Sequence, residues 1–257
     1  MSAITVVKIG GNVIDNPEAL QRFVRDFAAL PGPKILVHGG GKEATRLAGT
    51  LGVEVQMIEG RRITDAQMLE IVTMVYAGAV NKRIVALLQA AGCDAIGLSG
   101  ADANVVRARR RSPEPVDYGF VGDIEAVSAE RLQLLLEAGL TPVFSAIMHD
   151  GAGTLLNCNA DSVAAAVATG IAPLGAVDLV YCFEKAGVLR DAEDETSVIP
   201  EITRAAFEQL KAGGIVNRGM IPKIENALRS VEQGVRSVAI KRADCLHDPA
   251  AGTTIHE

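Results

Sequence analysis

The stretch ITVVKIGG, residues 4–11, decides how the rest of the chain is interpreted. Its first six residues form a short run rich in β-branched side chains, which is typical of a strand buried on both faces of a parallel sheet. Lys8 interrupts this run, and an ammonium group is costly to bury unless an anion meets it. Gly10 and Gly11 then leave the backbone N–H groups open to a ligand. The pattern predicts a phosphate site, and its alternative is a lysine that reaches the surface before an ordinary turn.

The composition is that of a globular protein with a large core. The chain has 257 residues, of which 49% are hydrophobic, enough for one large α/β unit or two lobes. No uninterrupted apolar run nears the ~18 residues needed to span a membrane, and the first residues lack the order of a signal peptide. We therefore expect a cytoplasmic protein with no membrane partner.

Charge and cysteine usage argue against a nucleic-acid-binding protein and against a zinc protein. The net charge of −6 disfavours a nucleic-acid partner, and the basic run RARRR at residues 107–111 has no interleaved aromatic residues. We interpret that run as a solvated hairpin or loop. The four cysteines are widely scattered and lack the spacing of a zinc site, so reduced thiols and no protein-held metal are predicted.

Strand and helix signals alternate along the chain, which predicts an α/β fold. Asn16 and Pro17 form an N-cap and a first helical position. Short alternating strands at residues 103–127 are expected as hairpins on the rim of the sheet. Buried strands are predicted at residues 4–9, 34–38, 94–98, 141–147, 177–183 and 236–240. Helices are predicted at about 17–29, 42–51, 64–80, 81–91, 128–138 and 219–233, and a further helix follows residues 157–161 and ends at about 171.

Three glycines follow the second strand and precede a helix. Gly39, Gly40 and Gly41 would place backbone amides and the positive end of a helix at the carboxyl edge of the sheet. This arrangement predicts an anion-binding corner, although neither a P-loop nor a GxGxxG fingerprint is present. Close packing of helix on strand is the alternative explanation for the glycines.

The helix expected at residues 64–80 has apolar side chains on more than one face. Thr64 and Gln67 match a capping box at its start. A helix of this kind is buried on two sides, either in the core or in a subunit interface. Arg62, just before it, is a candidate carboxylate clamp or a solvated surface residue.

Two later segments bring further polar groups. The sequence NCNAD at residues 157–161 offers Asn157, Asn159 and Asp161 just before a helix, as ligand contacts or as plain helix caps. Lys223 falls in the first turn of its helix, where the helix dipole disfavours a cation. We therefore expect an anion to be held beside Lys223.

Together these motifs resemble the amino acid kinase superfamily and, within it, the family of N-acetyl-L-glutamate kinases. The resemblance covers nearly the whole length and is carried, in the family's order, by KIGG (8–11), HGGG (38–41), GRRITD (60–65), IGLSGADANVV (96–106), GFVGDI (119–124), NCNAD (157–161), GMIPK (219–223) and the terminal GTTI. It implies a three-layer α/β/α sandwich around a mostly parallel sheet of about eight strands. It also implies an acyl amino acid-binding lobe over residues 1–172 and an ATP-binding lobe over residues 173–257.

The resemblance implies transfer of the ATP γ-phosphoryl group to the side-chain carboxylate of N-acetyl-L-glutamate, giving an acyl phosphate in arginine biosynthesis. The implied catalytic residues are Lys8, Lys223, Asp161 and Gly11, and the implied substrate contacts are Gly40, Gly41, Arg62, Asn157 and Asn159. ATP would be held by Gly10, Gly11, Glu184, Lys185, Ala186, Gly187, Val188, Leu189, Ile215, Val216 and Asn217. Mg²⁺ would arrive on the nucleotide phosphates rather than in a protein cage.

The chain departs from the family pattern at two places. Glu184-Lys185-Ala186-Gly187 replaces the usual Asp-Val-Pro-Gly type of nucleotide loop, and residues 145–150 with Cys158 change the run near the acyl pocket. The acyl group could therefore be succinyl or another acyl instead of acetyl. The rivals are another kinase of the same fold, acting on uridylate, aspartate or carbamate chemistry, and a non-catalytic nucleotide-sensing module. Arginine-inhibited members of the family carry an extra amino-terminal helix, whereas the first strand here is expected to begin at residue 4. The resemblance therefore implies a homodimer that arginine does not regulate, rather than a ring hexamer, and we expect the helix at 64–80 to join its subunits.

Overall fold

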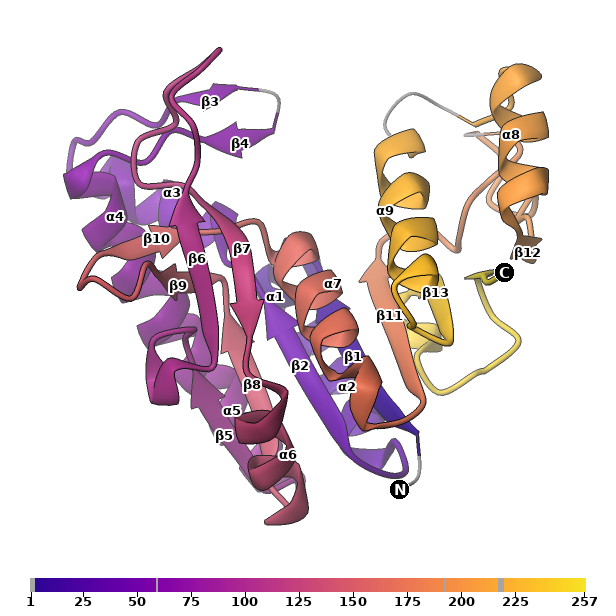
Figure 1. The fold of residues 1–257 in the computed structure, drawn as a ribbon, viewed down its shortest axis with the longest axis horizontal. Helices are drawn as coiled ribbons and strands as arrows, with labels where there is room; N and C mark the ends of the chain where they lie inside the picture. Colours follow the sequence, from indigo (N-terminus) through magenta and orange to yellow (C-terminus); the bar gives the residue numbers. More distant parts are fainter. Residues whose placement is uncertain (1–2, 59, 192, 217–219) are drawn as a thin grey trace.

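The computed structural model describes residues 3–58, 60–191, 193–216 and 220–257. Its centre is an eight-stranded sheet made of β1 (Ile4–Ile9), β2 (Lys34–His38), β5 (Ala95–Leu98), β8 (Thr141–Ser145), β11 (Val177–Phe183), β12 (Glu201–Ile202), β13 (Ser237–Arg242) and β14 (Thr253–Ile255). The strand order is β12-β14-β13-β11-β1-β2-β8-β5 (Figure 1). Among the described strands of this sheet, β13 and β14 are the one antiparallel pair, and the other neighbours are parallel. The predicted mostly parallel eight-stranded sheet is therefore confirmed.

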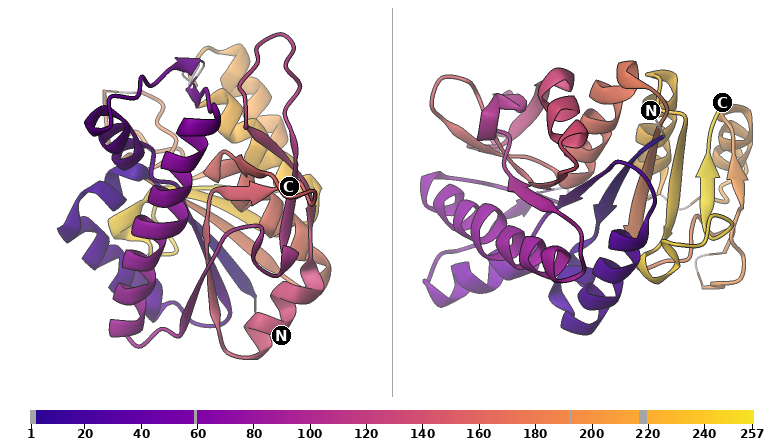
Figure 2. Two further views of the ribbon diagram at one scale, coloured as in Figure 1. Left: turned by 90° about the vertical axis from the view of Figure 1, so that its left-hand side faces the viewer. Right: turned by 90° about the horizontal axis from the view of Figure 1, so that it is seen from below.

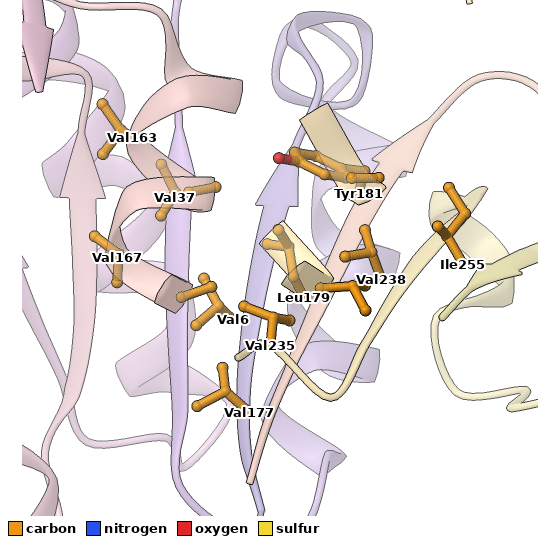
Figure 3. Close-up of a cluster of buried hydrophobic side chains, with 14 of the residues drawn as sticks. Val6, Val37, Val163, Val167, Val177, Leu179, Tyr181, Val235, Val238 and Ile255 are labelled. Carbon is orange, nitrogen blue, oxygen red and sulfur yellow. The ribbon is translucent and has the colours of Figure 1, made fainter. Parts of the chain in front are cut away.

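Helices cover both faces of this sheet, which confirms the three-layer sandwich. The side chains of β1 divide between two buried clusters: Ile4 and Val6 belong to one, Val7 and Ile9 to the other. Figure 3 shows Val6 and Val37 of the first cluster beside Val163 and Val167 of α7. The first cluster packs under α6 (Ala129–Glu137), α7 (Ala160–Ile171), α8 (Arg204–Ala212) and α9 (Ile221–Glu232), and the second under α1 (Gly11–Asp15), α2 (Pro17–Ala29), α3 (Gly41–Thr50), α4 (Ala66–Thr73) and α5 (Asn81–Ala90).

Several predicted boundaries agree with the structure to the residue. Helix α2 begins at Pro17, and the Asn16 side chain accepts hydrogen bonds from the N–H groups of Glu18 (3.1 Å) and Ala19 (3.0 Å). The strands predicted at 4–9, 34–38 and 177–183 are β1, β2 and β11. Local signals sufficed here because a strong cap or a continuous apolar run marks each end.

The segment after Arg62 differs from its prediction at two points. The capping box is wrong, because Asp65 is the N-cap of α4 and accepts a 2.8 Å hydrogen bond from the Met68 N–H. Nor does a new helix start at Asn81: α4, a π-helix η1 (Met74–Val80) and α5 form one continuous helix (Figure 2). By length and composition, the helix over residues 66–90 would suffice to cross a membrane. Its buried side chains pack on the second core cluster instead.

A second, four-stranded sheet contains the predicted rim hairpin. Its strands are β6 (Val106–Arg110), β7 (Gly122–Val127), β9 (Ile147–His149) and β10 (Leu155–Asn157), in the order β10-β9-β6-β7, and a two-stranded ribbon is formed by β3 (Met57–Ile58) and β4 (Arg61–Arg62). The loop between β6 and β7 returns to the start of α4, where the Phe120 N–H donates to the Thr64 carbonyl (2.6 Å). The four-stranded sheet therefore places β10 and the start of α4 side by side.

Candidate functional site

The carboxyl ends of β1, β2 and β11 meet at one edge of the main sheet. A cavity of about 560 Å³ opens there between α1, the N-terminus of α3, the N-terminus of α7 and the start of α9. It is lined by the five glycines of the two predicted glycine motifs and by both predicted catalytic lysines, together with Asp161 and the loop after β11: Lys8, Gly10, Gly11, Gly39, Gly40, Gly41, Asp161, Glu184, Lys185, Gly187 and Lys223. Residues from five distant parts of the sequence thus converge on one site.

Lys8 and Asp161 form an ion pair at the floor of this cavity. The Lys8 Nζ atom lies 2.8 Å from Asp161 Oδ1, and Lys8 is only 8% exposed. Asp161 is in the first turn of α7, where the helix dipole favours a carboxylate. Strand β1 therefore places a nearly buried cation at the site, and the Asp161 carboxylate on α7 partly balances its charge.

Lys223 reaches the same cavity from the first turn of α9. Its Nζ atom lies 3.9 Å from the centre of the Phe183 ring, and the Lys8 Nζ atom lies 4.9 Å from it. The pKa of Lys223 lies below its usual value, chiefly because burial disfavours the charged ammonium group. The positive charge of Lys8 lowers this pKa further, and the carboxylates of Asp161 and Glu184 partly oppose the shift. Within the described part of the chain, Asp161 is ion-paired with Lys8 rather than with Lys223.

The glycine corner combines close packing with free amides. A Cβ atom on Gly40 would lie 2.7 Å from Tyr76 Cδ1, so the close-packing explanation holds at this position. Gly41 is the first residue of α3, and the N–H groups of a first turn have no partner within the helix. The Gly10 N–H, by contrast, already donates to the Cys182 carbonyl at 3.1 Å. The backbone N–H groups of Gly40 and Gly41 are thus more available to an anion than the N–H group of Gly10.

A buried histidine fixes the backbone just before this corner. His38 Nε2 lies 3.0 Å from Asn81 Nδ2, and His38 Nδ1 lies 2.8 Å from the Gly39 carbonyl oxygen. Because the Asn81 amide nitrogen donates, Nε2 accepts and Nδ1 carries the proton. Burial lowers the pKa of His38 to about 4, so the ring is neutral near pH 7 and its tautomer is defined.

Arg62 lies against the start of α3. It is 7% exposed, and its Nη2 atom donates to the Gly41 carbonyl (2.9 Å) and to Thr45 Oγ1 (2.8 Å). Burial raises the pKa of the Tyr76 hydroxyl, and the neighbouring positive charge of Arg62 opposes the shift. The solvated-surface alternative for Arg62 is therefore excluded, and its remaining N–H groups are the ones available to a carboxylate.

The two asparagines of NCNAD have different surroundings. Asn157 is buried, and its Nδ2 donates to Thr64 Oγ1 (3.0 Å). Asn159 is exposed, caps α7 by accepting from the Ser162 N–H (3.0 Å), and lines a neighbouring groove of about 530 Å³ between β7, α7 and α9, which shares Asp161 with the cavity. Burial raises the pKa of the Cys158 thiol between them to about 12.

The predicted nucleotide contacts are only partly brought together. Among the described residues, Glu184, Lys185 and Gly187 line the cavity, while Ala186, Leu189, Ile215 and Val216 do not. Val188 is buried and its N–H donates to Thr253 Oγ1 (2.8 Å). Asn217 lies outside the described residues. No group of three or more His, Cys, Asp or Glu side chains in the described ranges is placed to hold a metal ion.

Two aromatic residues at the site were not singled out from the sequence. Phe183 contacts both lysines, and Tyr76 packs on Gly40 and lies beside Arg62. Phe183 is the last residue of a buried strand, and that position was its only sequence signal. Tyr76 lies in the π-helix, a feature that often occurs at functional sites but has no clear sequence pattern.

Comparison with known proteins gives consistent matches over nearly the whole chain. Residues 3–242 match the model of the amino acid kinase family. The chain is 52% identical to a protein named acetylglutamate kinase from Bacteroides thetaiotaomicron, over 95% of each chain. It is 53% identical to the protein of that name from Cytophaga hutchinsonii, over 96% of this chain and 94% of the relative. The crystal structure of smu.665 from Streptococcus mutans superposes with a TM-score of 0.78 at 28% identity, covering 100% of this chain and 99% of the other.

Proposed function

This chain belongs to the amino acid kinase family, and from that premise we propose that it transfers the ATP γ-phosphoryl group to the side-chain carboxylate of N-acetyl-L-glutamate. The product is an acyl phosphate, and the reaction belongs to arginine biosynthesis. The observation that carries the proposal is the pairing of Lys8 with Asp161 beside Lys223 and the glycine corner, in a chain about half identical to proteins named acetylglutamate kinase.

The chemistry of this reaction needs charge stabilisation rather than a base. A carboxylate nucleophile is already ionised at pH 7, so no proton has to be removed from it. Two anions must approach each other, and negative charge is redistributed over the transferring oxygens. Lys8 and Lys223 supply positive charge at the cavity, and Asp161 holds Lys8 in place. The N–H groups of Gly11 and Gly40 are assigned to the phosphoryl oxygens.

The acyl amino acid is assigned to the α3 side of the cavity, towards Arg62 and Asn157, which lie beyond the residues that line it. Arg62 there binds the α-carboxylate, and Gly40 and Gly41 lie against the substrate backbone. Asn157 contacts the substrate amide, with Thr64 fixing its Nδ2. Asn159 acts chiefly as the cap of α7, which positions Asp161 two residues later.

ATP is assigned to the side of the cavity near Glu184, Lys185 and Gly187, over the carboxyl-terminal part of the sheet. The division into an acyl amino acid-binding lobe (1–172) and an ATP-binding lobe (173–257) follows from that assignment. The two lysines and the free amides of the glycine corner suit polyphosphate oxygens. Mg²⁺, carried on the nucleotide phosphates, would neutralise part of their charge when bound. The enzyme is assigned to the cytoplasm, where ATP is available.

Hydroxylamine trapping of the acyl phosphate tests this function and the acyl group together. With ATP, the chain should give a hydroxamate from N-acetyl-L-glutamate, and N-succinyl-L-glutamate and free glutamate are compared at the same concentration. A higher kcat/KM for the succinyl compound would reassign the acyl group within the same reaction. Absence of hydroxamate from every acyl amino acid, with ATP binding intact, would favour a non-catalytic nucleotide sensor.

The chain is also proposed to form a homodimer through the helix over residues 66–90. Met68 and Val72 of this helix point into the core and are 2% and 0% exposed, so neither can form the contact. Met74 is instead 53% exposed on this helix. In a two-fold interface each position meets its own neighbourhood across the axis, so one substitution places two new charges in the contact.

Met74→Asp is therefore expected to dissociate the dimer while leaving the fold intact. Light scattering at matched concentrations measures the mass of wild type, Met74→Asp and a control, Leu134→Asp, whose leucine is 61% exposed on α6. The control should stay dimeric. A wild-type mass near 26.9 kDa would refute the dimer. A Met74→Asp protein as dimeric as the control would refute this helix as the interface.

A further inference from the structure

Phe183 lies in the catalytic cavity, but no role in binding the substrates or in stabilising charge has been assigned to it above. It is the last residue of β11, next to β1, and its ring forms part of the wall of the catalytic cavity. The ammonium groups of Lys8 and Lys223 both lie over this ring, at 4.9 Å and 3.9 Å from its centre. One aromatic ring therefore contacts two cations that come from different elements of the fold.

Bringing these two cations together is electrostatically unfavourable before any phosphate arrives. Lys8 and Lys223 repel each other, and Lys8 has the nearer carboxylate, Asp161, at 2.8 Å. Lys223 also lies in the first turn of α9, where the N–H groups of the helix repel a cation. The charged groups that act on Lys223 are Asp161 from α7, Lys8 from β1 and Glu184 after β11, and burial opposes its charged form.

An aromatic ring relieves this problem without supplying a competing anion. Its face carries negative electrostatic potential, so a cation within about 6 Å of the centre is attracted to it. Unlike a second carboxylate, the ring does not have to be displaced or neutralised when phosphate oxygens enter the cavity. A ring at this position stabilises the ammonium groups and still leaves their hydrogen-bond donors to the substrates.

The ring itself is fixed by its neighbours. Phe183 stacks on Tyr181, with ring centres 6.0 Å apart and planes 16° apart. Tyr181 is buried, and its hydroxyl donates to the backbone carbonyl of Asp161 (3.2 Å). The two rings thus link the end of β11 to the first turn of α7, which carries the partner of Lys8.

We propose that Phe183 is a positioning residue for phosphoryl transfer, whose ring face holds the Lys8 and Lys223 ammonium groups over the cavity before the substrates bind. The proposal rests on the proposed kinase function, because the role of the two lysines comes from that function. It adds an electrostatic task for an uncharged residue, and it predicts that the electron density of the ring matters as well as its size.

Stepwise fluorination of this ring tests the proposal. Fluorine withdraws electron density from the ring face and changes the ring volume little, so site-specific incorporation of mono-, di- and trifluorophenylalanine at position 183 weakens the contact gradually. We expect kcat to fall with each fluorine, to roughly tenfold below wild type for the trifluoro ring, and the KM for the acyl amino acid to stay constant. The pKa of Lys223, followed by NMR of its side-chain carbon, should fall in the same order.

A matched control lies elsewhere in the chain. The Lys34 ammonium lies 5.7 Å from the centre of the Phe27 ring, far from the cavity residues, so trifluorophenylalanine at position 27 should leave kcat unchanged. A kcat and a Lys223 pKa that stay constant through the position-183 series in an active enzyme would overturn the proposal. A wild type that forms no acyl phosphate would instead contradict the kinase function, while the Lys223 titration would still report on the ring contact.

Discussion

Replacing Lys8 with alanine is expected to lower kcat about a thousandfold while changing the affinity for ATP by less than about tenfold. The lysine acts mainly on charge that develops during transfer, so its loss affects the transition state more than binding. A unit charge about 4 Å from another, at an effective dielectric constant near 20, contributes about 4 kcal/mol. That energy corresponds to about three orders of magnitude in rate. Steady-state kinetics and calorimetric titration with ATP measure the two quantities.

Lys34→Ala is the matched control for this experiment. Lys34 is also 8% exposed and lies on the neighbouring strand β2, but its Nζ atom donates to the carbonyls of Ala28 (2.7 Å) and Leu30 (2.6 Å), away from the cavity. Its loss should lower stability and leave the kcat of the folded protein unchanged. If the kcat of Lys8→Ala stays within about threefold of wild type, Lys8 is not catalytic.

Arg62→Lys is expected to raise the KM for the acyl amino acid roughly ten- to a hundredfold, because the guanidinium holds Gly41 and Thr45 through Nη2 and keeps other N–H groups for the carboxylate, and an ammonium group cannot do both. The KM for ATP should change much less, since the guanidinium lies against α3 and Tyr76 rather than beside the loop after β11. The measurement is the ratio of the two KM changes in the same protein preparation.

Arg61→Lys controls for the effect of altering the hairpin. Arg61 is the preceding residue of β4, is more exposed than Arg62, and lines the neighbouring groove beside α7 rather than the cavity. Its replacement should leave both KM values near wild type. Equal increases in both KM values for Arg62→Lys would show that Arg62 supports the structure around α3 instead of binding the α-carboxylate.

The helices and strands whose bounds were predicted correctly are those whose ends are determined by residues close in the sequence. The unbroken apolar run around Lys8 and the Asn16 cap each act within a few residues, and their elements have the predicted bounds. The capping box failed because a tertiary contact competed for Thr64. Its hydroxyl accepts from Asn157, 93 residues later, and donates to the Arg62 carbonyl, which left Asp65 to cap the helix.

The residues of the candidate site divide in the same way. Lys8, Gly41 and Asp161 stand at strand or helix ends that the sequence marks, and the parallel sheet brings those ends to one edge. Phe183 and Tyr76 depend on which strands are neighbours and on a π-helical turn, so neither could be connected with the lysines or with Arg62 from the sequence. Asn159 is exposed and its side chain caps α7, and its predicted contact with the substrate stays a prediction.

The most direct test of the account follows the γ-phosphorus of ATP by ³¹P NMR in the presence of the enzyme, Mg²⁺ and N-acetyl-L-glutamate. We expect ADP and an acyl phosphate to appear together, and hydroxylamine to convert the acyl phosphate to inorganic phosphate and a hydroxamate. The Lys8→Ala protein should show neither change on the same timescale. Unchanged ATP, or release of inorganic phosphate with no hydroxamate formed in the presence of hydroxylamine, would contradict phosphoryl transfer to a carboxylate at this site.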